Sequence, residues 1–127
     1  MDIQEKKVWR EVGYGQRFLN AFRGMRVFWA ATNNLFVGMS VVSILAVIFF
    51  GFYFQISEVE WLALVFAIGF VIVSEAFNTA IEIDIDLTSP EYHPYARDTK
   101  DVAAAAVLLS VFTAIIVGLI IFLPKIF

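Results

Sequence analysis

Two long stretches without a charged residue constrain this chain more than any other feature of its sequence. Residues 35–54 give 20 such positions in a row, and residues 102–123 give 22. At a rise of 1.5 Å per residue, about 20 residues of helix cross the roughly 30 Å hydrocarbon core of a bilayer. The 61% share of hydrophobic residues also lies above the roughly 45–50% of soluble domains. Both stretches are therefore predicted to be transmembrane helices.

A third apolar stretch, residues 61–73, has only 13 positions and is too short to cross the bilayer alone. The next 13 residues contain neither glycine nor proline, so we predict one helix over 61–86. This helix is apolar in its first half and carries a polar stripe in its second. Pro90 and Pro94 then predict a turn, and Pro124 is expected to end the last helix.

The positive charges are distributed unevenly along the chain. Residues 1–33 carry six of the nine Lys and Arg residues, and the connection at 55–60 carries none. Arg97 and Lys100 lie in the second connection, before the last span. The positive-inside rule therefore predicts that the N-terminus and the second connection lie on the cytoplasmic side. With three spans, the C-terminus is expected on the opposite side.

The segment before the first span, residues 1–33, shows helical periodicity. Four large apolar residues fall within about 60° of one another on a helical wheel. They are Phe18, Phe22, Met25 and Trp29. This pattern indicates an amphipathic helix at the membrane interface, although packing of the same face on the other helices explains it equally well. We expect an all-α membrane protein in which residues 1–127 form a single domain.

A polar stripe runs along the second half of the predicted helix 61–86. At 100° per residue, three carboxylates and one amide share one face, and Asp84 points away from it. The four residues are Glu75, Asn78, Glu82 and Asp86. Ionisable groups at membrane depth are costly without partners, and oxygen ligands with no cysteine suit Mg²⁺. An ion path or a lock between helices remains an alternative interpretation of the stripe.

A second polar cluster lies in the connection before the last span and at the start of that span. It comprises Glu91, Tyr92, His93, Arg97, Lys100 and Asp101. Carboxylates that hold a metal beside such cations suit phosphoryl transfer, because metal and cations offset the phosphate charge. The cations could instead anchor lipid head groups, and His93 could simply form a hydrogen bond in the loop.

Three motifs make the pattern specific: SEAFNTAIE at 74–82, SPEYHP at 89–94 and KDVAA at 100–104. Together they resemble the prokaryotic diacylglycerol kinase family, which comprises small trimeric membrane lipid kinases. The last two motifs look most like the undecaprenol kinases of Gram-positive type. The resemblance implies a homotrimer that transfers the γ-phosphoryl of MgATP to a lipid hydroxyl, with undecaprenol the first choice and diacylglycerol the second. We expect no nucleic-acid partner.

The resemblance also implies roles for individual residues. Glu75 is expected to be the general base on the lipid hydroxyl, Glu82 a ligand of metal and ATP, and Asn78 a positioning residue, with Asp86 in the same stripe. Further contacts with ATP are implied for five residues of the second cluster. These are Glu91, Tyr92, His93, Lys100 and Asp101.

Two positions depart from the family pattern. Thr32 stands where the family has a second metal-binding Glu, and Asn20 stands where an aromatic residue usually contacts ATP. We expect Thr32 to face the polar stripe that contains Glu82. The departure at Thr32 supports an alternative function, in which the chain is a catalytically impaired, kinase-derived membrane subunit or interaction protein.

Overall fold

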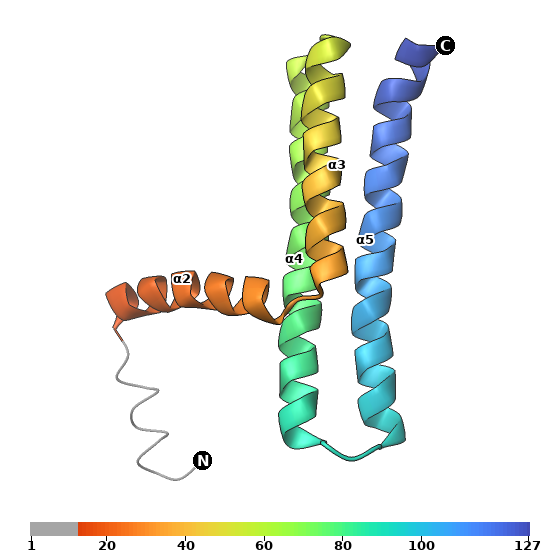
Figure 1. The fold of residues 1–127 in the computed structure, drawn as a ribbon. Coiled ribbons are helices and arrows are strands. Elements are labelled where there is room, and N and C mark those ends of the chain that lie inside the picture. The colour runs from red at the N-terminus through yellow and green to blue at the C-terminus, as the bar shows by residue number, and fades with distance from the viewer. Residues whose placement is uncertain (1–12) are drawn as a thin grey trace. The chain divides into compact units, whose positions relative to one another are not determined.

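The computed structural model describes residues 13–127, and within this range it contains four α-helices and no strand (Figure 1). The helices are α2 (Tyr14–Ala31), α3 (Asn34–Tyr53), α4 (Glu58–Thr88) and α5 (Pro94–Ile126). The last three are each long and apolar enough to cross a membrane. The predicted fold class, an amphipathic helix followed by three transmembrane helices, is confirmed.

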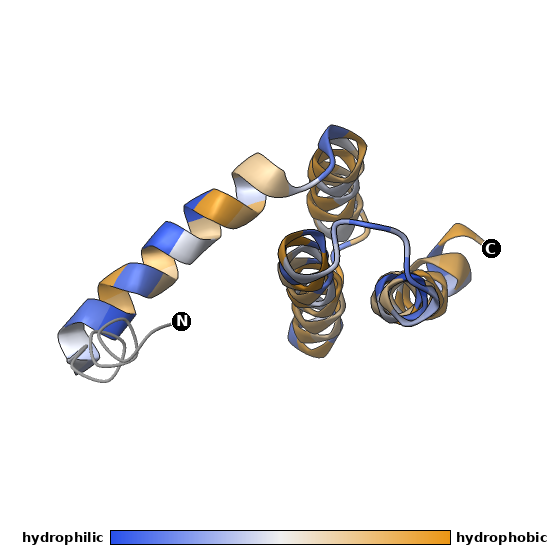
Figure 2. Ribbon diagram, turned by 90° about the horizontal axis from the view of Figure 1, so that it is seen from below, coloured by the Kyte–Doolittle hydropathy of each residue, from blue (hydrophilic) through white to orange (hydrophobic). Residues whose placement is uncertain are grey.

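Helix α2 is described by itself, because its position relative to the other helices is not determined. Hydrophobic and hydrophilic residues alternate along it (Figure 2). The rings of Phe18 and Phe22 pack edge to face with centroids 5.2 Å apart, and the Arg17 guanidinium lies over the Tyr14 ring. These contacts follow the spacing of three and four residues that places side chains on one face of a helix. Three of the N-terminal cations, Lys6, Lys7 and Arg10, lie outside the described residues.

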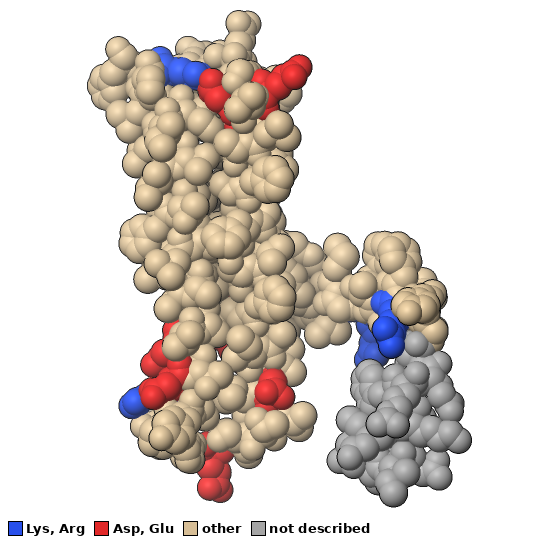
Figure 3. All heavy atoms as spheres, turned by 180° about the vertical axis from the view of Figure 1, so that it is seen from behind, with Lys and Arg blue, Asp and Glu red and all other residues tan. Residues whose placement is uncertain are grey.

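Helices α3, α4 and α5 run side by side in alternating directions (Figure 1). Helix α4 packs chiefly against α5, and α3 makes fewer contacts with α4. We call the end of the bundle with the connection between α3 and α4 the α3–α4 end, and the opposite end the α4–α5 end. On the face shown in Figure 3, charged side chains gather at these two ends and leave an uncharged band between them. Such a band is the surface that a bilayer requires.

Helices α4 and α5 are longer than the bilayer is thick. Their 31 and 33 residues correspond to about 46 and 50 Å at 1.5 Å per residue, against a hydrocarbon core of about 30 Å. Part of each helix therefore extends beyond the apolar band. The loop that joins them at the α4–α5 end is hydrophilic (Figure 2).

The α3–α4 end is held by close packing and by an ion pair. The Trp61 indole lies against Gly51, where no side chain stands in its way. Ser57 caps α4 by accepting a hydrogen bond from the backbone N–H of Glu60. The Lys125 ammonium lies 3.0 Å from Glu60 Oε2 and so joins the last turn of α5 to the first turn of α4.

Helix α5 extends beyond the apolar stretch 102–123 at both ends. It begins at Pro94, where the fixed φ of proline suits the first turn of a helix. It also continues through Pro124 to Ile126, so the expectation that Pro124 ends the helix is wrong. Pro124 lacks only one N–H group, and the loss of one hydrogen bond is tolerated in a last turn.

We predict that Gly51→Ala destabilises the bundle. A methyl group at this position would lie 2.6 Å from Trp61 Cζ2, so the indole would have to move. Overpacking of this kind costs about 1–3 kcal/mol of unfolding free energy. The control is Gly69→Ala in α4, because a methyl group there meets nothing within 4 Å and alanine favours helix. Unfolding by SDS titration in mixed micelles measures both, and equal stability of the two variants would contradict the prediction.

Candidate functional site

The polar stripe predicted for α4 lies in the half of the helix that leads to the α4–α5 end. Burial decreases along it, since Glu75 and Asn78 are each only 8% exposed, whereas Glu82 and Asp86 are exposed. We call these four residues the polar row. The row leads from the interior of the bundle to its surface, so its two ends offer different environments to a substrate.

Glu75 is the most deeply placed carboxylate of the polar row. Its Oε1 accepts a hydrogen bond of 3.1 Å from the hydroxyl of Thr32, which is itself only 6% exposed. Thr32 therefore faces the polar row, as expected, and its partner in the row is Glu75. Glu82 lies seven residues further on, about 10 Å along the helix axis.

Local structure at the start of α3 explains why Thr32 reaches this position. Asn33 caps α3, and its side chain accepts a 2.7 Å hydrogen bond from the backbone N–H of Leu35. The cap residue has extended backbone dihedral angles, so the chain changes direction immediately after Thr32. The hydroxyl of Thr32 is thereby directed at α4 instead of following the surface of α3.

Asn78 joins the buried part of the polar row to the exposed part. Its amide nitrogen donates a 3.4 Å hydrogen bond to Glu82 Oε1, one turn further along α4. Its amide oxygen is buried and has no hydrogen-bond partner among the residues that the structure describes. Because an unpaired buried carbonyl oxygen costs about 1–3 kcal/mol, this atom is suited to receive a donor or a cation from a bound ligand.

The donor set around Asn78 fits a magnesium ion that takes most of its ligands from elsewhere. Between residues 13 and 127, no three His, Asp or Glu side chains gather closely enough to hold a metal by themselves. Mg²⁺ is commonly bound by one or two carboxylates together with water and substrate phosphates. The Glu82 carboxylate and the orphaned Asn78 oxygen would satisfy that requirement.

The second polar cluster surrounds a hollow of about 250 Å³ at the α4–α5 end. The hollow is lined by all six residues that the sequence placed in the cluster. They are Glu91, Tyr92, His93, Arg97, Lys100 and Asp101, and Asp86 joins them from α4. The exposed end of the polar row thus opens into a site with cations on its wall.

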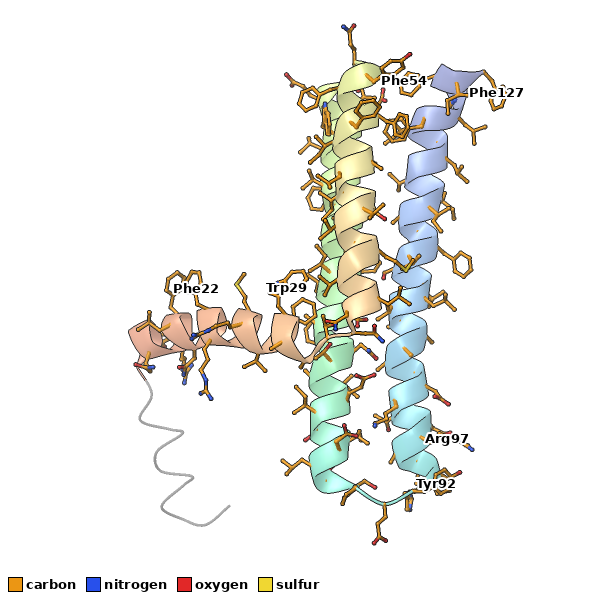
Figure 4. All side chains as sticks on the ribbon, in the orientation of Figure 1. Phe22, Trp29, Phe54, Tyr92, Arg97 and Phe127 are labelled. Atoms are coloured by element: carbon orange, nitrogen blue, oxygen red, sulfur yellow. The ribbon has the colours of Figure 1, made fainter. Side chains whose placement is uncertain are left out.

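Three polar contacts involve residues in the wall of this hollow. Lys100 donates a hydrogen bond to Asp86 and so links α5 to α4 beside the exposed end of the polar row. Arg97 donates to the Tyr92 hydroxyl over 3.2 Å and forms an ion pair of 2.9 Å with Asp98. Tyr92 and Arg97 lie together at this end of the bundle (Figure 4).

His93 has a structural role in addition to any contact with a ligand. Its Nδ1 accepts a 3.2 Å hydrogen bond from the backbone N–H of Tyr95 and caps α5. The interpretation of His93 as a loop residue that forms hydrogen bonds is confirmed for this nitrogen, and its contact with ATP stays a prediction. Asp84 is exposed, and its carbonyl accepts a hydrogen bond from Thr88 outside the hollow.

An apolar cavity of about 260 Å³ lies among α3, α4 and α5 within the apolar band. Its lining includes Phe36 of α3, Ile72 of α4 and Val111 of α5. Ile72 precedes Glu75 by three residues, less than one turn of α4, so the cavity approaches the buried end of the polar row. A hydrocarbon chain in this cavity would place its polar head near Glu75.

Proteins with similar sequences occur in several bacteria. The prokaryotic diacylglycerol kinase family profile matches residues 19–122. An undecaprenol kinase of Bacillus subtilis (strain 168) is 42% identical over 80 residues, which are 63% of this chain and 65% of that protein. A diacylglycerol kinase of Synechocystis is 34% identical over 112 residues, which are 84% of this chain and 61% of that protein. The chain therefore matches just under two thirds of the length of these two relatives.

The match of the family profile to most of the chain decides its membership. The chain belongs to the prokaryotic diacylglycerol kinase family. A diacylglycerol kinase of Escherichia coli (strain K12) is a more distant relative, 26% identical over 96 residues that cover 76% of this chain and 77% of that protein. The range matched by the family profile contains Thr32, the polar row and the whole hollow.

Two contacts of this family member could not be found by reading its sequence. The bond between Thr32 and Glu75 joins residues 43 positions apart, although the family pattern did direct attention to Thr32. The bond between Arg97 and Tyr92 crosses from α5 to the loop, where no helical spacing rule applies. In both cases the residues were identified as polar members of a site, and only their partners were missed.

Proposed function

We propose that this chain is a membrane lipid kinase that transfers the γ-phosphoryl group of ATP to the hydroxyl of a membrane lipid. The observation that carries the proposal is the position of Glu75, a buried carboxylate near the lining of an apolar cavity. It forms the inner end of a polar row whose outer end opens into a hollow with Arg97 and Lys100 on its wall. A lipid hydroxyl and a polyphosphate have to meet at such a boundary. The names of the relatives in B. subtilis, Synechocystis and E. coli support the same activity.

Undecaprenol is our first choice of acceptor and diacylglycerol the second. The undecaprenol kinase of B. subtilis shares 42% identity over its matched region, which favours a polyprenyl alcohol. The apolar cavity accepts part of a hydrocarbon chain of either type, so it supports a lipid acceptor without selecting between the two.

The proposed reaction uses the two ends of the polar row for different steps. Glu75 accepts the proton of the lipid hydroxyl, and the lipid oxygen forms a bond to the γ-phosphorus of ATP. The bond between that phosphorus and the bridging oxygen breaks, and ADP leaves with the bonding electron pair. Lys100, with Asp101 beside it in the hollow, binds the nucleotide, and the cationic side chains offset its charge.

Glu82 and Asn78 are the residues that would hold a magnesium ion. The ion, when bound, would supply charge neutralisation on the phosphate oxygens. Glu91, Tyr92 and His93 form the loop wall against which the nucleotide would lie, and Asp86 orients Lys100 through their hydrogen bond.

We further propose that residues 1–127 form one domain in the bacterial inner membrane, with residues 1–33 at the interface and spans at 35–54, 61–86 and 102–123. A cytoplasmic N-terminus would place the hollow on the side where ATP is available, because the α4–α5 loop follows two crossings after it. A homotrimer would cover apolar faces of the helices that this single chain leaves exposed.

A second candidate function is a kinase-derived membrane subunit or interaction protein with impaired catalysis. It is favoured by the hydroxyl of Thr32, which cannot replace a metal-binding carboxylate, and by the lack of a larger acidic cluster within residues 13–127. The two functions are separated by an assay of purified protein in detergent with radiolabelled ATP, Mg²⁺ and either undecaprenol or diacylglycerol. Label in an extracted lipid supports the kinase, and label in neither lipid favours the second function.

We predict that Glu75→Gln lowers kcat by about 10²-fold or more, because general base catalysis contributes roughly that factor. Nucleotide affinity should stay within a few fold of wild type, since Glu75 lies at the buried end of the polar row. Asp84→Asn, an exposed position on the other side of α4, is the matched control. Turnover with both lipids and equilibrium binding of ATP are measured, and an equal fall in both quantities would make Glu75 a ligand instead of a base.

For Lys100 we predict a defect in nucleotide binding. Lys100→Gln removes a charge that faces the hollow, and loss of one charged hydrogen bond should raise the KM for ATP by about tenfold or more. Lys125→Gln is the matched control, because Lys125 forms the corresponding ion pair with α4 at the opposite end of the bundle. A similar rise in the KM of both variants would show that the effect comes from weakened packing of α5.

Glu82→Gln is expected to lower turnover by about 10²-fold, because an amide keeps the shape of the side chain and loses the anionic metal ligand. Higher concentrations of Mg²⁺ should restore part of the activity if the loss is one of metal affinity. Titration of activity against Mg²⁺ measures both effects. Retention of more than about a third of wild-type turnover would remove Glu82 from the metal site.

A further inference from the structure

The buried hydrogen bond between Thr32 and Glu75 suggests a role for Thr32 that metal binding does not explain. Its hydroxyl lies 3.1 Å from Glu75 Oε1, and both residues are buried. We propose that Thr32 is a positioning residue, whose hydroxyl fixes one oxygen of the Glu75 carboxylate and leaves the other, Oε2, to accept the proton of the lipid hydroxyl. This inference rests on the proposed function of Glu75 as the base.

The chemistry of the two groups supports this division between the carboxylate oxygens. An ionised carboxylate is an acceptor only, and the Thr32 hydroxyl has a single proton to donate. One hydrogen bond therefore engages one oxygen and selects one orientation of a side chain that has three rotatable bonds. A base that is already oriented towards its substrate avoids the loss of rate that accompanies misplacement by about 1 Å.

The position of Thr32 in the fold makes it a firm support for Glu75. It lies directly before the capped start of α3, where Asn33 fixes the backbone through its bond to Leu35. At the far end of the same helix, Gly51 packs against Trp61 of α4. The chain therefore contacts α4 both near the end of α3, at Gly51, and just before its start, where Thr32 meets the Glu75 carboxylate.

The hydroxyl at position 32 adds no second negative charge beside Glu75. Two carboxylates at the same place would repel each other unless a cation lay between them. A neutral donor orients Glu75 without the need for such an ion. The role of Thr32 is thus separate from that of Glu82 and Asn78.

The first test compares Thr32→Val with Thr32→Ser in the full-length protein. Valine keeps the shape of threonine and removes the hydroxyl, whereas serine keeps the hydroxyl. Thr32→Val should lower kcat about tenfold with an unchanged KM for ATP, and Thr32→Ser should stay within about twofold of wild type. Thr79→Val, at another buried threonine, which lies in α4, controls for the loss of a buried hydroxyl elsewhere in the protein.

A double variant tests whether Thr32 acts through Glu75. If Thr32 acts through Glu75, adding Thr32→Val to Glu75→Gln should produce little further loss, because the two effects are not additive. Equal losses of kcat in the valine and serine variants, or a raised KM for ATP with kcat unchanged, would overturn the proposal. An additive double variant would do the same.

A second measurement tests the contact independently of activity. The hydrophobic reagent dicyclohexylcarbodiimide adds to buried carboxyl groups, and mass spectrometry of peptides locates the product. Modification of Glu75 should proceed several-fold faster in Thr32→Val than in wild type and should be unchanged in Thr32→Ser. If wild type phosphorylates neither lipid but labelling rises as expected, the proposed function fails and the contact stands. If wild type is active and labelling does not respond to Thr32→Val, the positioning role is overturned.

Discussion

The cost of placing polar groups in a bilayer is the constraint on which this structure depends. A carboxylate at membrane depth is tolerated only beside a partner or in contact with water. Glu75 meets this requirement through the hydroxyl of Thr32, and Glu82 and Asp86 meet it by their exposure towards the α4–α5 end. The length of α4 makes the arrangement possible, because its 31 residues carry the polar row out of the apolar band while the helix remains continuous.

The same constraint explains how the two long helices are held together. In their apolar halves α4 and α5 have only apolar and small polar side chains to pack, and apolar packing gives little preference for one register in lipid. Lys125 with Glu60 at one end and Lys100 with Asp86 at the other fix that register by charge. The second pair also lines the hollow, so a contact that stabilises the fold at the same time positions a cation for a ligand.

Sequence periodicity was sufficient to predict the polar row, because the row depends only on the spacing of its residues along α4. The cluster around the hollow was also predictable, since its members lie in one connection and the first turns of one helix. Contacts between segments that lie far apart in the sequence could not be predicted. Nothing in the sequence indicates that Thr32 meets Glu75 rather than Glu82, because that choice depends on the direction of the chain at Asn33. The expectation that Pro124 ends α5 was wrong for a different reason, because the last turn of a helix tolerates one missing hydrogen bond.

Burial decreases along the polar row from Glu75 to Asp86, so the proposed lipid and nucleotide would approach it from opposite ends. At the Glu75 end the row is only slightly exposed, so a proton acceptor there would act on a lipid hydroxyl with little competition from solvent. At the Asp86 end, the row is open, and a charged nucleotide can enter and leave without losing all of its hydration. Asn78 lies between these environments, with its amide nitrogen on Glu82 and its buried oxygen unpaired. In the proposed reaction that oxygen lies between the lipid and the nucleotide, where a bound ligand could supply the donor or cation that it lacks.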